Sequence, residues 1–157
     1  MKTPCEKALI RRAKIQDGAA ITELINYYAR QGDMLSRSQA QIYNQLRDFI
    51  VADESDAVVG CGALHIIWDN LAEVRSLAIA PEKVGQGLGR AIVEQLLLEA
   101  AELSLTQVFT LTYKPVFFEK LGFSRVDKKD LPHKVWKDCI HCPKFPDCDE
   151  VALIKMI

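Results

Sequence analysis

Three glycines alternate with other residues in the stretch Val84–Arg90, at the boundary between two patterned segments. The apolar segment before it stops at Pro81, which is typical of the end of a strand. After it comes one helical stripe of apolar residues, formed by Leu88, Ile92, Leu96 and Ala100. The stretch therefore predicts a strand, a glycine loop and a helix that begins directly at the glycines.

A loop of this kind can bind an anion. Backbone N–H groups at the start of a helix have no partners within the helix, and the helix dipole favours negative charge there. Glycines let a pyrophosphate approach the backbone closely without the help of a lysine. The stretch is not a P-loop, because no Gly-Lys-Ser or Gly-Lys-Thr follows, and its spacing differs from the dinucleotide fingerprint. A turn with a purely structural role is the alternative.

The remaining patterns alternate between strand and helix. Alternation and turn residues predict strands at 8–13, 48–52, 57–68, 71–79 and 107–112, one from Phe123, and one at 150–156. Helical spacing predicts a helix that Asp17 caps and that ends near Gly32, a second capped by Ser36 or Ser38, and a short one ending at Gly122. The short connections between the strands from 48 to 79 indicate an antiparallel meander. The expected fold class is α+β, with helices layered on one sheet.

Composition narrows the class of protein. A chain of 157 residues has the length of one domain, expected to span residues 1–157, and its net charge is −1. No overall positive field recruits nucleic acid or an anionic membrane. The longest weakly polar run, 58–68, is well short of the about 20 apolar residues that a membrane span needs, and the N-terminus lacks the apolar region of a signal peptide. We therefore expect a soluble cytoplasmic protein.

The order of these pieces resembles the GNAT acyltransferases. The segment Glu73–Pro81, the glycine loop, the long helix, a strand and Phe117–Phe123 follow one another as in that family. The resemblance implies a mixed, mainly antiparallel sheet of about seven strands with helices on both faces. It implies acetyl-CoA as co-substrate, held by the backbones of Leu77, Ala78, Ile79, Val84, Gly85, Gln86, Gly87, Leu88, Gly89 and Arg90 and contacted by Phe118.

Within that family the chain resembles the acetyltransferase domain of N-acetylglutamate synthases, over roughly residues 8–137. The segments that carry this resemblance are 34–38, 73–75, 111–113, 117–123, 126–127 and 131–132. It implies acetyl transfer to the α-amine of L-glutamate, a step of arginine biosynthesis, by a short stand-alone form that has no room for an amino-acid-kinase domain. Transfer to another amine, such as a different amino acid or a protein N-terminus, and a metal- or redox-sensing module remain the alternatives. A homodimer is left open.

The resemblance also implies catalytic residues. Glu73 lies where carboxylates of the family act as general base, and the backbone N–H near Leu77 or Ala78 becomes an oxyanion donor if the strand bulges there. Phe118 replaces the tyrosine that often protonates the leaving thiolate, and Val84 replaces the usual glutamine or arginine of the loop. Tyr113 is the expected substitute acid, with solvent as the alternative. His65 is read as a structural histidine.

Glutamate carries two carboxylates, so its pocket needs at least two cations, and the planar guanidinium suits carboxylates best. The candidates are Arg37, Arg75 and Lys134.

A separate cluster contains three thiols and one imidazole, those of Cys139, Cys142, Cys148 and His141. These ligand types suit zinc, but the spacing is incomplete, so no metal is expected and a zinc site is kept as an alternative. The favoured interpretation is a structural loop with buried thiols; a redox-sensing pair is a further alternative.

Overall fold

The computed structural model describes residues 8–132 and 149–157. The strands within these ranges are β1 (Leu9–Arg12), β2 (Phe49–Glu54), β3 (Ala57–Trp68), β4 (Leu71–Ile79), β5 (Gln107–Thr112), β6 (Ser124–Val126) and β7 (Val151–Met156). The helices are α1 (Gly18–Ala29), α2 (Gln39–Asn44), α3 (Leu88–Glu102) and α4 (Pro115–Glu119), with short 3-10 turns at 15–17, 46–48, 81–83 and 128–130. None of these helices has the length and apolar character needed to cross a bilayer.

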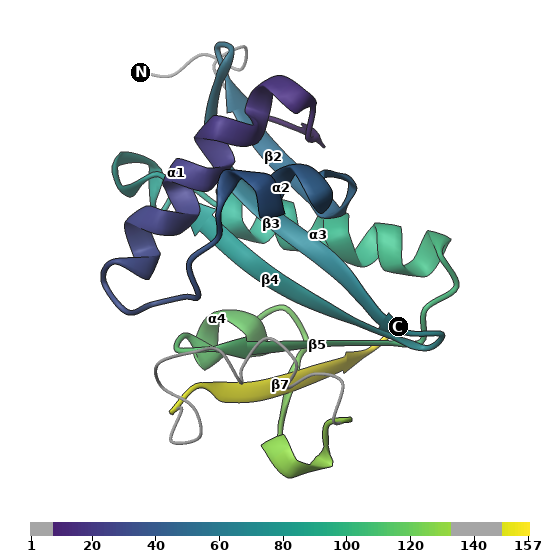
Figure 1. Ribbon diagram of the computed structural model, residues 1–157. Coiled ribbons are helices and arrows are strands. Elements are labelled where there is room, and N and C mark those ends of the chain that lie inside the picture. Colours follow the sequence, from purple (N-terminus) through teal and green to yellow (C-terminus); the bar gives the residue numbers. More distant parts are fainter. Residues whose placement is uncertain (1–7, 133–148) are drawn as a thin grey trace. The chain divides into compact units, whose positions relative to one another are not determined.

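The seven strands of the described ranges form one sheet in the order β1-β2-β3-β4-β5-β7-β6 (Figure 1). The neighbouring pairs are antiparallel at β1–β2, β2–β3, β5–β7 and β6–β7, and parallel at β4–β5. The parallel pair follows from the helix α3 that connects its strands, because a parallel pair needs a crossover connection. The predicted α+β class with a mainly antiparallel sheet is confirmed.

The turn between β2 and β3 is shorter than predicted. We expected one strand to end at residue 52 and the next to begin at residue 57, but β2 continues to Glu54. Ser55 and Asp56 alone make the turn, with φ of 54° and 67°. Two central residues with positive φ give a hairpin turn that matches the twist of the strands, so the hairpin closes with two residues.

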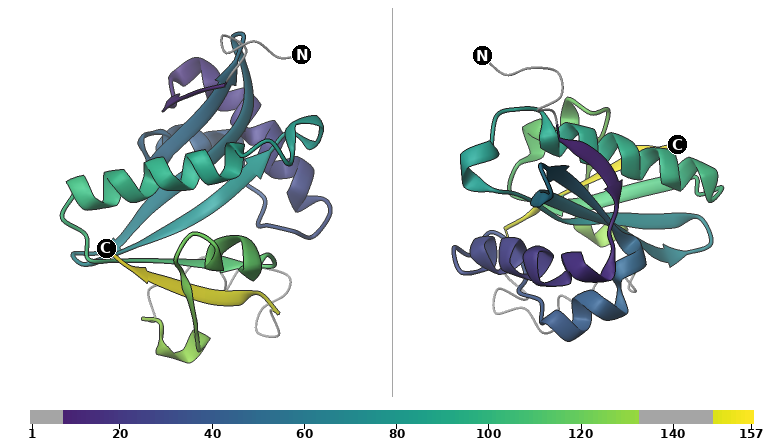
Figure 2. Two further views of the ribbon diagram at one scale, coloured as in Figure 1. Left: turned by 180° about the vertical axis from the view of Figure 1, so that it is seen from behind. Right: turned by 90° about the horizontal axis from the view of Figure 1, so that it is seen from above.

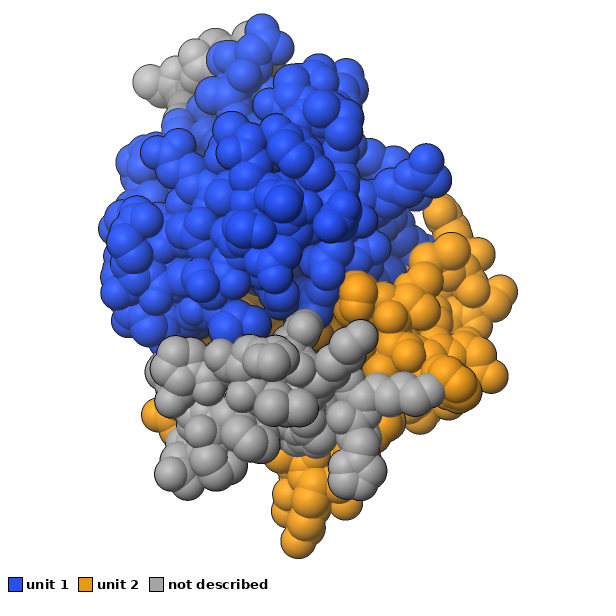
Figure 3. Space-filling view, viewed as in Figure 1, with its two compact units in different colours: residues 1–64, 74–99 blue, residues 65–73, 100–157 orange. Residues whose placement is uncertain are grey.

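The chain forms two compact units, shown in different colours in Figure 3. Unit 1 consists of residues 1–64 and 74–99, and unit 2 consists of residues 65–73 and 100–157. The strands β3 and β4 and the helix α3 each contribute residues to both units. Each unit is described by itself below.

In unit 1, α1 and α2 cover one face of the strands and α3 covers the other (Figure 2). The core under α1 and α2 consists of Ile21, Ile25, Ile42, Phe49, Val51, Cys61, Ala63 and Ala78. On the α3 face, β3 presents Gly60 and Gly62, and a Cβ added at Gly62 would lie 2.8 Å from a methyl carbon of Ile92. The two glycines therefore let α3 pack closely on the sheet, which fixes where its N-terminus lies.

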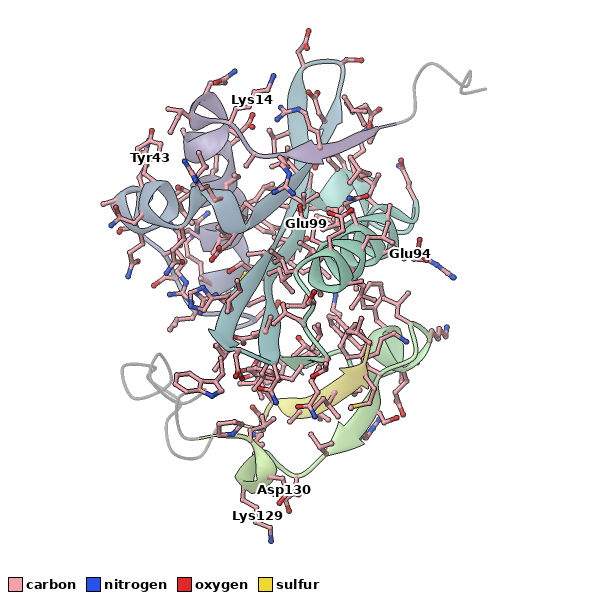
Figure 4. All side chains as sticks on the ribbon, turned by 90° about the vertical axis from the view of Figure 1, so that its right-hand side faces the viewer. Lys14, Tyr43, Glu94, Glu99, Lys129 and Asp130 are labelled. Atoms are coloured by element: carbon pink, nitrogen blue, oxygen red, sulfur yellow. The ribbon has the colours of Figure 1, made fainter. Side chains whose placement is uncertain are left out.

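Two acidic residues of α3 show how this helix is oriented (Figure 4). Glu94 lies on the outer side of the helix and forms an ion pair of 2.8 Å with Arg90. Glu99 is only 7% exposed and forms an ion pair of 3.0 Å with Arg12 of β1. The second contact ties the later turns of α3 to the first strand of unit 1.

The residue before α1 is not the cap we expected. Asp17 precedes the first helical residue, but its carboxylate makes no capping bond to the helix. It accepts hydrogen bonds from the Lys14 backbone N–H (2.7 Å) and from both terminal nitrogens of Arg11 (2.7 and 3.0 Å). These hydrogen bonds hold the pKa of Asp17 below its ordinary value, against the opposing effect of burial. The carboxylate therefore joins β1 to the start of α1.

The start of α2 agrees with the prediction. Ser38 accepts a hydrogen bond from the Gln41 backbone N–H (3.1 Å), and the Gln41 side chain accepts one from the Ser38 N–H (2.8 Å). This reciprocal pair is a capping box, so the residues just before Ser38 enter the helix in a fixed direction. Gly32, at the other end of the loop, has a φ of 79°, as suits a residue that ends a helix.

Unit 2 has its own small core. Leu71, Phe109, Leu131 and Ala152 are buried together. The strands β5 and β7 pair over six residues each. The parallel β4–β5 ladder has three pairs and ends at Glu73 and Phe109.

Candidate active site

The glycine loop of unit 1 has the backbone conformation that glycines permit. Gly85 and Gly87 have φ of 86° and 83°, in the left-handed region that other residues avoid, and no protein atom lies within 4 Å of a Cβ built on either. Gly89 already lies in α3, which begins at Leu88. The loop thus has an open side next to a helix N-terminus, the geometry that a bound phosphate requires.

The charge at this helix end also suits an anion. The first turn of α3 contains no acidic residue, although acidic residues are the ones that stabilise a helix N-terminus. It contains Arg90 instead, a cation whose side chain is 65% exposed and whose partner is Glu94 in the next turn. The N–H groups and Arg90 together favour a negatively charged ligand.

At Ser76, the alternation of side chains between the two faces of β4 shifts by one residue. Before this point, Arg75 reaches Gln45 at the end of α2, with 3.2 Å between Nη2 and Oε1. After it, Ala78 belongs to the core under α1 and α2, whereas Leu77 lies next to Gly62 on the α3 face. Regular alternation would place residues 75 and 77 on one face. Ser76, with φ of 57°, supplies the extra step, which is the irregularity expected of a bulged strand.

The thiol of Cys61 occupies the irregular part of β4. Its Sγ lies 3.5 Å from the Ser76 carbonyl oxygen, and the Ala78 backbone N–H donates to it. Cys61 is fully buried, and this burial raises the pKa of its thiol to about 12. The Ala78 N–H, one of the two expected oxyanion donors, therefore already has a partner in this structure.

The edge of β4 that faces away from β3 presents the backbones of Leu77 and Ile79, since alternate residues direct their N–H and C=O groups to opposite edges. The bond from the Ala80 N–H to the Val59 carbonyl of β3 (2.8 Å) confirms that the even-numbered residues here face β3. The Ile79 carbonyl accepts a hydrogen bond from the Tyr28 hydroxyl of α1. Burial raises the pKa of Tyr28, so this hydroxyl stays protonated as a donor. The edge of β4 that faces away from β3 therefore carries the backbone groups of Leu77 and Ile79, of which the Ile79 carbonyl already has Tyr28 as a partner.

Arg37 lies in the loop before α2 and is only 9% exposed. It lines an open recess of about 520 Å³ together with Asn26, Ala29, Arg30, Ser36 and Ser38. Two of these lining residues are arginines and two are serines, whose side chains are of the kinds that bind carboxylates. Arg75 is held at the other end of α2 by Gln45, so one short helix separates the segments that hold the two predicted acceptor residues.

The other predicted residues of the described ranges belong to unit 2. Glu73 is half-buried at the last pair of the β4–β5 ladder, two residues before Arg75 on the same strand. Tyr113 is half-buried directly after β5. Phe118 is 4% exposed and makes edge-to-face contacts with Phe117 and Phe123, so most of its ring is packed against neighbouring aromatic side chains. His65 is half-buried near the end of β3.

Comparison with known proteins identifies the family. Residues 45–125 match the model of the acetyltransferase (GNAT) domain. An uncharacterized N-acetyltransferase of Chlorobaculum tepidum is 38% identical over 98% of this chain and 99% of that protein. The chain belongs to the GNAT acetyltransferase family. It is therefore an acyltransferase, as predicted, and the expected co-substrate of a GNAT enzyme, acetyl-CoA, is confirmed.

Other GNAT proteins are similar over most of the chain. An amino-acid acetyltransferase of Mycobacterium tuberculosis is 36% identical over 84% of this chain and 77% of that protein. A crystal structure of a Mycobacterium tuberculosis protein in complex with CoA has a TM-score of 0.81, with 32% identity over 95% of this chain and 99% of that one. An N-acetylglutamate synthase of Neisseria gonorrhoeae, complexed with coenzyme A and N-acetyl-glutamate, has a TM-score of 0.85 and 23% identity; the match covers 95% of this chain and 35% of that one. The similarity to this synthase shows a common fold.

Some predictions lie outside the described residues. These are the acceptor role of Lys134 and the cluster of Cys139, His141, Cys142 and Cys148. Within residues 8–132 and 149–157, no group of three or more histidine, cysteine or acidic side chains is arranged to hold a metal ion.

Four side chains that shape this GNAT site were missed in the sequence: Asn26, Tyr28, Gln45 and Cys61. Each acts on a segment distant in the chain, so no local pattern indicates it. The irregularity of β4, in contrast, is visible in the sequence. Val74 is followed by Leu77 and Ile79, and the step of three residues interrupts the spacing of two that a regular strand would show.

Proposed function

We propose that this GNAT enzyme transfers the acetyl group of acetyl-CoA to the α-amine of L-glutamate. The observation that carries the proposal is the pair of arginines fixed at the two ends of α2. Arg37 lines the recess before this helix, and Arg75 bonds to Gln45 after it. Two guanidinium groups suit an amino acid with two carboxylates. The names of the similar proteins, amino-acid acetyltransferase and N-acetylglutamate synthase, favour the same class of acceptor.

The proposed reaction is a direct transfer. The amine nitrogen attacks the thioester carbonyl carbon, a C–N bond forms, and the carbonyl oxygen becomes an oxyanion near the Leu77 N–H. The C–S bond then breaks, and CoA leaves as a thiolate. Glu73 takes the proton that the amine loses, and the thiolate takes a proton from Tyr113 or from solvent. Cys61, buried and protonated, takes no part as a nucleophile.

Acetyl-CoA would lie along unit 1 in this proposal. The glycine loop and the N-terminus of α3 would hold its pyrophosphate, and Leu77 and Ile79 would pair with the pantetheine arm as an added strand does. The departure at Val84 affects this site little, because the N–H groups and not the side chains bind the phosphates. The proposed product is N-acetylglutamate, and the proposed pathway is arginine biosynthesis.

An acceptor panel tests the proposal. Release of CoA is measured with purified protein, acetyl-CoA and one of L-glutamate, L-glutamine, L-aspartate, L-lysine or a peptide with a free N-terminus. L-glutamate should give the highest kcat/KM, with intersecting initial-rate lines that indicate direct transfer. A preference for an uncharged or basic amine would overturn the glutamate assignment, and parallel lines would overturn direct transfer.

A further inference from the structure

The side-chain amide of Asn26 binds the backbone of Arg37 in both directions. Its Nδ2 donates to the Arg37 carbonyl oxygen over 2.8 Å, and its Oδ1 accepts from the Arg37 N–H over 3.0 Å. Asn26 lies in the second half of α1, eleven positions before Arg37. The amide therefore takes the place that a neighbouring strand would have beside this residue.

This clamp acts on the last residue before the cap of α2. Residues 30–38 join α1 to α2 outside any helix or strand, and the capping box holds only Ser38 and Gln41. Because the Asn26 bonds hold the N–H and the C=O of one residue, they restrict the backbone dihedral angles of Arg37 itself. The Asn26 side chain also lines the recess beside Arg37 and Arg30.

We propose that Asn26 is a positioning residue for the acceptor: it holds Arg37 so that the guanidinium is in place before the carboxylate of the substrate arrives. The inference rests on the proposed function, because it takes Arg37 as a carboxylate ligand. A long side chain on an unclamped loop must be ordered when the ligand binds, and this ordering weakens affinity. Asn26 needs no contact with the substrate to have this effect.

The first test is Asn26→Ala, compared with Thr22→Ala as a matched control. Thr22 lies one helical turn earlier on α1, and its hydroxyl donates to the Gly18 carbonyl over 2.7 Å, a bond within the helix. Loss of the two Asn26 bonds should raise the KM for L-glutamate about tenfold and leave the KM for acetyl-CoA within about twofold of wild type. Thr22→Ala should leave both KM values within about twofold of wild type.

A double mutant separates positioning from a general structural role. If Asn26 acts through Arg37, the variant carrying Asn26→Ala and Arg37→Ala should have the same KM for L-glutamate as Arg37→Ala alone, within about twofold. A structural defect independent of Arg37 would instead multiply the two effects. Asn26→Leu, which keeps the branched shape of the side chain and removes both bonds, should raise the KM for L-glutamate as Asn26→Ala does, and it replaces Asn26→Ala if that variant does not fold.

Each result has one interpretation. A change of less than twofold in the KM for L-glutamate in Asn26→Ala, or multiplying effects in the double mutant, would overturn the positioning role. The proposed function still stands in that case if Arg37→Ala uses L-glutamate poorly. If Arg37→Ala itself uses L-glutamate like wild type, the acceptor role of Arg37 fails, and the role of Asn26 fails with it.

Discussion

The Cys61 thiol of β3 lies 3.5 Å from the Ser76 carbonyl oxygen of β4, at the one left-handed residue within the described strands. A backbone group of β3 would be the usual partner at this place. The thiol is longer than a backbone group and reaches across the irregularity. A buried side chain of β3 thus stabilises the backbone of β4 where the oxyanion donor is predicted.

Replacement of Cys61 by valine tests this contact. Valine can neither donate to Ser76 nor accept from Ala78, and it is larger than cysteine by about one methyl group. We expect the free energy of unfolding to fall by about 1–2 kcal/mol, measured by urea denaturation, because a buried carbonyl loses its partner. Serine, which restores a donor, should recover part of the loss. If Cys61→Val matches wild type in stability, the contact does not hold the strand.

Gly87→Val should weaken acetyl-CoA binding at least about tenfold, which corresponds to about 1.4 kcal/mol. Gly87 has a φ of 83°, so a branched residue strains the loop, and its Cβ would enter the open space where the pyrophosphate is expected. Calorimetric titration with acetyl-CoA measures the effect. Val84→Ala is the control: its side chain is 59% exposed and its N–H is retained, so affinity should be nearly unchanged. Equal affinity in a folded Gly87→Val protein would contradict the phosphate site.

Arg37→Ala and Arg75→Ala should each lower kcat/KM for L-glutamate about 10- to 150-fold, the range expected when a charge-assisted contact of about 1.5–3 kcal/mol is lost. Binding of acetyl-CoA, followed by calorimetry, should be unaffected. Lysine at either position should restore only part of the activity, because it lacks the planar fork. Wild-type kinetics in both alanine variants would remove these residues from the acceptor site.

Asp17 should contribute to the pH dependence of stability. The hydrogen bonds from Arg11 hold its pKa below the ordinary value of 3.8, so its contribution is present above that value and is lost as the pH falls through the lowered pKa. Asp17→Asn should reduce the free energy of unfolding at pH 7 by about 1–2 kcal/mol, since Arg11 loses one of its two carboxylate partners and keeps the other, Asp53, at 3.1 Å. The stability of this variant should also depend less on pH below about pH 4.

The exposed pair Arg90–Glu94 provides the control for Asp17. Its side chains are 65% and 54% exposed, so Glu94→Gln should change stability by less than about 0.5 kcal/mol. Urea denaturation at several pH values gives both results. A loss in Asp17→Asn as small as in the control would show that the buried ion pair contributes little.

The strands and the glycine loop were predictable because their signals are local. The bounds of β3, β4 and β5 agree with the prediction, since alternation and turn residues lie within each segment. Ser38 could be predicted as a cap because Gln41 follows at the spacing of a capping box.

The partners that hold the candidate site were not predictable in this way. Gln45 and Arg75 are thirty residues apart, and Cys61 and Ser76 are fifteen residues apart. Such pairs depend on which strand or helix packs beside which, and that is decided by the core as a whole. The capping role of Asp17 failed for the same reason, because Arg11 of another element competes for its carboxylate.

The extra residue at Ser76 serves the candidate site and not the packing of β4. Deletion of Ser76 would join Arg75 directly to Leu77 and straighten the strand, and regular alternation would then keep every later side chain on its present face. Leu77 and Ile79 would stay beside Gly62 and Gly60, and Ala78 would stay in the core under α1 and α2. Such a variant loses only the irregular backbone where the oxyanion donor is predicted, so this deletion should impair activity more than it impairs the fold.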